Sequence, residues 1–120
     1  MAVSAPHLTR AATADPEKRV TFAFLLTGLV ALLFGALLGP LQALNYAGVN
    51  VYGYFPFLAS YYQGLTLHGV LNALVFTTFF ICGFLLYLPA KELGLRFNLT
   101  WVWSAYALML GGLVMAGVAI

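Results

Sequence analysis

Residues 20–38 have the sequence VTFAFLLTGLVALLFGALL, and none of these side chains is charged. A helix needs about 20 apolar residues to cross the roughly 30 Å hydrocarbon layer of a bilayer, so this run is long enough to span one. Across the 120 residues, 63% are hydrophobic and 7% are charged. About a quarter of the residues of a soluble domain are charged. The sequence therefore predicts a membrane protein.

Two further apolar runs lie near residues 61–88 and 101–120. With the first run they predict an all-α fold, a polytopic transmembrane helix bundle with about three spans in residues 20–120. Residues 1–19, which are rich in Ala, Thr and charged side chains, are expected to form a flexible cytoplasmic tail.

The ends of these runs are marked by proline and by the end of the sequence. Proline cannot readily continue a helix, so we expect the first helix to end at Gly39–Pro40 and the second before Pro89. The third run reaches Ile120 without a polar flank. From that abrupt stop we expect the chain to be a piece of a larger multi-pass protein.

Basic residues precede the first run and follow the second, whereas residues 40–60 have none. Short cytoplasmic segments of membrane proteins collect Lys and Arg, so both basic segments and the amino terminus are predicted to be cytoplasmic. A clustered basic face for nucleic acid is not evident, and no nucleic-acid partner is expected. The basic residues concerned are Arg10, Lys18, Arg19, Lys91 and Arg96.

His68 is the most informative polar residue, because it lies inside an apolar run. Ionisable groups within membrane helices are costly and usually face a partner or a site. Asn72 follows four residues later and Gly64 precedes by four, so the three share one helix face. Gly64 removes side-chain bulk where a flat macrocycle would approach, and Asn72 or Thr66 could orient the ring. The lone Cys82 cannot form a disulfide or thiolate metal site with another cysteine of this chain.

The residues alone leave three roles open for His68: a hydrogen bond across a helix interface, axial ligation of haem iron, and a proton relay. Neutral imidazole is a good axial ligand of haem iron, and its second nitrogen can be held by a carbonyl, hydroxyl or amide. His7, in the polar tail, is expected to be solvated.

Three strings carry a resemblance to a known family: GPLQALNYAG at 39–48, SYYQGLTLHGVLNALVF at 60–76 and YLPAKELGLRFN at 87–98. Together they resemble the amino-terminal part of subunit I of the haem-copper oxygen reductases, of the B-type branch. The resemblance implies a bundle of twelve or more helices, with His68 as one of two axial ligands of the low-spin haem. It also implies that Tyr46 lies near the haem propionates.

The family further implies a terminal respiratory oxidase of the cytochrome c oxidase type, which reduces oxygen and moves protons. The low-spin haem, expected to be haem b, would feed a high-spin haem and copper whose ligands lie outside this chain, so the segment alone would be inactive. The implied partners are the remaining helices of subunit I, subunit II, membrane lipid, oxygen and either cytochrome c or quinol. The implied location is the plasma membrane of a prokaryote. Lys91-Glu92-Leu93-Gly94 stands where the A-type branch has an Asp-containing proton motif, which favours the B-type.

Two other functions stay open. A small haem-binding membrane anchor of a quinone-linked dehydrogenase would also have about three spans and a haem histidine. A structural membrane protein without a cofactor would need His68 for helix packing alone. The string at 39–76 favours the oxidase over the anchor.

Overall fold

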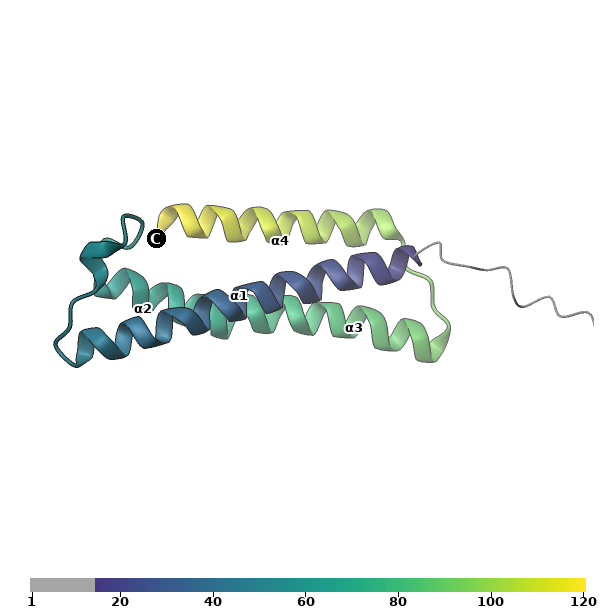
Figure 1. Cartoon of the computed structure of the whole chain (residues 1–120). Coiled ribbons are helices and arrows are strands. Elements are labelled where there is room, and N and C mark those ends of the chain that lie inside the picture. Colours follow the sequence, from purple (N-terminus) through teal and green to yellow (C-terminus); the bar gives the residue numbers. More distant parts are fainter. Residues whose placement is uncertain (1–14) are drawn as a thin grey trace, which may run out of the picture.

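The computed structural model describes residues 15–120, and over that part of the chain it is built of helices (Figure 1). Three of them are long and apolar enough to cross a membrane, which confirms the all-α fold class. They run back and forth beside one another (Figure 1). The predictions for His7, Arg10 and most of the tail lie outside the described residues. The helices are α1 (Pro16–Tyr46), a continuous helix at Tyr61–Leu93 and α4 (Leu99–Ala119).

Helix α1 begins at a capped end. The Asp15 side chain accepts a hydrogen bond from the Glu17 N–H, and Pro16 occupies the first turn, where its missing N–H costs nothing. Glu17 adds negative charge near the positive end of the helix dipole. These features fix the start of α1 just before the apolar run.

Helix α1 does not end at Gly39–Pro40, so that prediction is wrong. It continues through Pro40 to Tyr46. Proline removes one backbone hydrogen bond, and a long membrane helix tolerates this because neighbouring helices and local adjustments compensate. Here the turn after Pro40 is held against the second helix, since Gln42 is buried there.

The second membrane helix consists of three segments: α2 (Tyr61–Gly69), the π-helical segment η2 (Val70–Phe76) and α3 (Thr77–Leu93). Ser60 caps its start by accepting from the Gln63 N–H. The expected end before Pro89 is also wrong, because α3 continues to Leu93. Gly94 ends it in a left-handed conformation with φ of 62°, and the Leu95 N–H returns to the Ala90 carbonyl at 3.1 Å.

The core lies between α1 and the second helix, where buried side chains of both meet: Val20, Phe24, Ala31, Val75 and Phe79. Close approach requires glycine at Gly28, because a Cβ there would lie 3.2 Å from the Phe76 carbonyl oxygen and the Phe80 nitrogen. Dispersion contacts at such short separation, rather than hydrophobicity, drive helix pairing in lipid.

Helix α4 packs more loosely against the same core, and it has no buried residue. Asn98 caps its start by accepting from the Thr100 N–H at 3.1 Å. In its middle the Tyr106 hydroxyl lies 2.8 Å from the Thr27 hydroxyl of α1. Since the Thr27 hydroxyl already donates to the Ala23 carbonyl at 2.9 Å, Tyr106 is the donor in the link between the two helices.

The connection between α1 and α2 contains the short 3₁₀ helix η1 (Tyr52–Tyr54). Two side chains of this connection point inward: Tyr52 has 5% and Leu58 has 1% of its surface exposed. The Asn50 side chain accepts from the Tyr52 N–H at 3.0 Å and so fixes the turn. The loop is therefore folded back on the helix ends and positions Tyr52 beside Gly64.

Candidate functional site

His68 lies in the last turn of α2, half-buried against α1. Its Nδ1 atom is 2.7 Å from the carbonyl oxygen of Gly35. A carbonyl oxygen only accepts, so Nδ1 carries the hydrogen and donates it. In the neutral imidazole this leaves Nε2 with the lone pair, which is the form that binds a metal through Nε2.

No hydrogen bond joins His68 Nε2 to any residue within 15–120. The bond between His68 Nδ1 and the Gly35 carbonyl is a hydrogen bond across a helix interface, which is one of the three roles left open for His68. That bond uses only one of the two ring nitrogens, and it orients the other. Both the interface role and the ligand role are compatible with this geometry.

Asn72 lies one turn after His68, with its Nδ2 atom 3.2 Å from His68 Nδ1. Its Oδ1 atom is buried and has no hydrogen-bond partner among the described residues. Because Nδ1 bears a hydrogen, an acceptor suits this position better than the amide nitrogen does. Exchanging the oxygen and nitrogen positions of the amide puts Oδ1 beside the imidazole N–H. Asn72 thus borders the same nitrogen that Gly35 binds.

Two glycines of α1, one turn apart, make room for these side chains. A Cβ at Gly35 would overlap Oδ1 of Asn72 and would lie 2.7 Å from its Cγ. A Cβ at Gly39 would lie 3.4 Å from Cε1 of His68. The spacing of these two glycines in an apolar helix already indicates from sequence that another helix can approach closely. Which side chains lie against them could not be predicted from that spacing.

The π-helical segment η2 begins directly after Gly69 and contains Asn72. A π-helical turn holds more residues than an α-helical turn, so η2 changes the direction in which successive side chains leave the helix. Such segments occur often at functional sites. No residue pattern in Val70–Phe76 predicts it.

Gly64 is buried one turn before His68, next to two polar side chains from other elements. A Cβ there would lie 2.7 Å from both the Gln42 Nε2 atom and the Tyr52 hydroxyl oxygen. Among the described residues the side-chain polar atoms of Gln42 and Tyr52 have no hydrogen-bond partner. Gly64 thus accommodates side chains of α1 and of the loop, a reason for glycine that the sequence did not reveal.

Burial raises the pKa of Tyr52 from its ordinary value of 10.0, and the neighbouring Tyr61 adds to the rise. The adjacent side-chain amide of Gln42 partly offsets this rise by lowering the pKa of Tyr52. The causes agree with the position of the phenol, which is enclosed and lies in the loop between the two membrane helices.

The remaining predicted site residues are less closely associated with His68. Tyr46 is the last residue of α1 and is 89% exposed, so it is not packed against the imidazole. Thr66 donates to the Tyr62 carbonyl of its own helix at 2.9 Å, so its hydroxyl does not orient the His68 ring. Within residues 15–120 no three His, Cys, Asp or Glu side chains gather as a metal site.

The described part of the chain thus defines an all-helical protein of the membrane-spanning class, with an oriented histidine between two of its helices. The chain is similar to cytochrome c oxidase subunit 1 of Thermus thermophilus, with 49% identity over 97% of its length. This similarity confirms the resemblance to subunit I. The alignment covers 21% of that relative, so the chain spans about a fifth of its length. No family model matches the chain.

Proposed function

We propose that this chain is the part of an oxidase subunit I that supplies one axial ligand of the low-spin haem, through Nε2 of His68. The observation that carries the proposal is the 2.7 Å bond between His68 Nδ1 and the Gly35 carbonyl. It selects the tautomer in which Nε2 holds a lone pair. The similarity to a cytochrome c oxidase subunit supports haem iron as the metal in this proposal.

The donor set suits this group, because haem iron commonly takes an imidazole whose other nitrogen is held by a backbone carbonyl. When bound, the low-spin haem accepts and passes on single electrons. The chain's own residues hold the imidazole ring in one orientation. Gly35 fixes Nδ1 from α1, and Asn72 restricts the ring from the following turn.

Three further residues belong to the proposal with smaller roles. Tyr46, exposed at the end of α1, would approach the haem propionates. Gly64 leaves room for the Gln42 and Tyr52 side chains one turn before His68, and Asn72 supports the ligand. The haem is proposed to be haem b, and the ligands of the high-spin haem and copper would come from outside this chain.

The whole subunit is proposed to be a B-type oxidase that reduces oxygen, translocates protons and receives electrons from cytochrome c or quinol. Its partners would be subunit II, the other helices of subunit I and the lipid of a prokaryotic plasma membrane, with the amino terminus cytoplasmic. Lys91-Glu92-Leu93-Gly94 supports the B-type assignment. Similarity to an oxidase subunit favours this function over a dehydrogenase anchor.

The test replaces His68 in the assembled oxidase and records the low-spin haem spectrum. His68→Ala removes the ligand nitrogen, so we expect loss or a spin change of that haem and a collapse of oxygen uptake. Gly69→Ala is the matched control, because a Cβ at Gly69 meets nothing within 4 Å. We expect its spectrum to be unchanged.

His68→Gln separates ligand from packing. If His68 only ties α2 to α1, a glutamine keeps a donor for the Gly35 carbonyl and costs on the order of 1 kcal/mol. A His68→Gln oxidase with a full low-spin haem signal and normal turnover would contradict the ligand assignment.

A further inference from the structure

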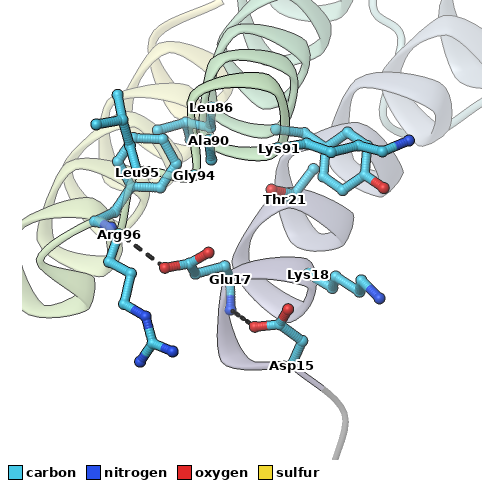
Figure 2. A pocket seen from close by; sticks show the side chains of 12 residues that line it. Asp15, Glu17, Lys18, Thr21, Leu86, Ala90, Lys91, Gly94, Leu95 and Arg96 are labelled. Atoms are coloured by element: carbon cyan, nitrogen blue, oxygen red, sulfur yellow. Dashed lines mark hydrogen bonds between the residues drawn. The ribbon is translucent and has the colours of Figure 1, made fainter.

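A pocket of about 330 Å³ lies at the end of the molecule where α1 begins and α3 ends (Figure 2). Its walls come from the first turns of α1, the last turns of α3 and the connection to α4. Since α1 and Tyr61–Leu93 are both of membrane-spanning length, this end lies at the depth of the lipid headgroups. That depth does not depend on which side of the membrane it faces.

The pocket contains charges of both signs that do not pair with one another. The cations are Lys18, Lys91 and Arg96, and the carboxylates are Asp15 and Glu17. Among residues 15–120 no Lys or Arg nitrogen lies within 4.0 Å of a carboxylate oxygen. Residues 1–14 contain no Asp or Glu that could serve instead.

Within residues 15–120 the carboxylates accept only backbone hydrogen bonds. Asp15 accepts from the Glu17 N–H, and Glu17 accepts from the Phe97 N–H, each at 3.3 Å. Each carboxylate retains further lone pairs for a cationic donor. The ammonium of Lys91 lies 5.9 Å from the centre of the Tyr87 ring, which holds it at the pocket wall.

A threonine hydroxyl also belongs to the lining of the pocket. Thr21 lines it and is only 6% exposed, and its hydroxyl has no hydrogen-bond partner within residues 15–120. Figure 2 shows Thr21 between the start of α1 and the end of α3. Apolar side chains, Leu86 and Phe97 among them, form the rest of the wall. The Thr21 hydroxyl is therefore available as a donor to a group bound in the pocket.

We propose that this pocket binds the headgroup of a zwitterionic aminophospholipid of the phosphatidylethanolamine kind. The phosphate contacts Lys18 and Lys91, one from each flanking helix, and the Thr21 hydroxyl donates to it. The primary ammonium donates to Asp15 and Glu17. A headgroup with both charges satisfies both sets of side chains, which are unpaired within residues 15–120, whereas a purely anionic headgroup would leave the carboxylates facing negative charge. The volume is within the range of small-ligand sites, about 300–1,000 Å³.

The experiment measures lipid retained on the delipidated full protein by native mass spectrometry. The added lipids are phosphatidylethanolamine, phosphatidylcholine and phosphatidylglycerol with identical acyl chains. We expect phosphatidylethanolamine to be retained best, since phosphatidylcholine has no N–H donors and phosphatidylglycerol has no ammonium. Equal retention of the three lipids, or displacement by inorganic phosphate alone, would overturn the proposal.

Lys18→Gln tests the phosphate contact. It should lower retention of all three lipids by about fivefold, corresponding to roughly 1 kcal/mol per basic residue at a membrane surface. The matched control is Arg19→Gln, which removes the same charge one residue along the chain. Arg19 is exposed and does not line the pocket. An equal loss in both variants would indicate a diffuse basic belt and would contradict a specific site.

Glu17→Gln tests the ammonium contact. Glutamine still accepts from the Phe97 N–H, so the fold is kept, but the negative charge is gone. We expect the preference for phosphatidylethanolamine over phosphatidylcholine to disappear. Glu92→Gln is the control, because Glu92 is exposed outside the pocket. Retention of the full preference in Glu17→Gln would sink the assignment of the ammonium, and circular dichroism checks that each variant is folded.

Discussion

Replacing Gly35 by alanine tests whether α1 and the second helix are as close at the His68 site as the structure indicates. The added Cβ would lie 2.7 Å from Cγ of Asn72 and 3.1 Å from its Nδ2 atom. Optimal carbon contacts are about 3.5–4.0 Å, so the amide must move by roughly 1 Å. The movement separates Asn72 from His68 or pushes the two helices apart.

The cost follows from these distances. Overpacking of a tight site costs about 1–3 kcal/mol, and the loss of one hydrogen bond inside a membrane averages about 0.6 kcal/mol. We therefore expect Gly35→Ala to lower the free energy of unfolding by about 1–3 kcal/mol. The assay is equilibrium unfolding of the full protein in mixed micelles, followed by circular dichroism.

Two comparisons make the result interpretable. Gly69→Ala adds the same methyl group where nothing lies within 4 Å, so it should be neutral or slightly stabilising, since alanine favours helix over glycine. Adding Asn72→Ala to Gly35→Ala removes the overlapping amide, and the two changes together should cost less than the sum of each alone. If the free energy of unfolding of Gly35→Ala lies within about 0.5 kcal/mol of that of the parent, the close packing at Gly35 is refuted.

Three further predictions concern other parts of the chain. Tyr106→Phe removes the 2.8 Å bond to Thr27 and should lower the unfolding free energy by about 0.6 kcal/mol, at most about 1.7, in the same unfolding assay; no change would mean that the link is not formed. Burial raises the pKa of Tyr52 above 10.0, so folding favours the neutral phenol. The contribution of Tyr52 to stability is therefore constant below pH 10.0 and is lost as the pH rises through the higher folded pKa. Melting temperatures should show this fall in the parent and not in Tyr52→Phe. In a Cys82→Ala background, a membrane-impermeant thiol reagent applied to intact cells should label Gly53→Cys and spare Leu95→Cys, and the opposite pattern would reverse the proposed topology.

Hydrophobicity and charge were enough to predict the helices, because a bilayer imposes the same requirement on every spanning segment. The predicted helix ends failed at Pro40 and Pro89 for a related reason. Both prolines lie inside long helices whose remaining hydrogen bonds and neighbours keep them intact. The second membrane helix ends instead at Gly94, which adopts a positive φ. In soluble proteins these same proline rules are more reliable, since water competes for the backbone groups that proline leaves without a helical partner.

His68 could be singled out from sequence, because an imidazole in an apolar run requires a partner. The identity of that partner could not, since Gly35 contributes a backbone carbonyl and carries no side-chain signal. Finding it requires knowing which face of α1 meets α2. The buried pair Gln42 and Tyr52 was hidden in the same way, because their meeting at Gly64 depends on how the loop folds back.

The anchor of the imidazole lies on a different helix from the imidazole itself. His68 belongs to α2, but the acceptor of its Nδ1 hydrogen belongs to α1. A rotation or a sliding of α1 against α2 would therefore turn the ring and redirect Nε2, even with α2 unchanged. Glycine at positions 35 and 39 keeps the two backbones close enough for this bond, and the overlap that a Cβ at Gly35 would make with Asn72 shows how little room remains. The packing of α1 is thus part of the geometry of the proposed ligand, since a change that separates the helices acts on the direction of the Nε2 lone pair as directly as a change in His68.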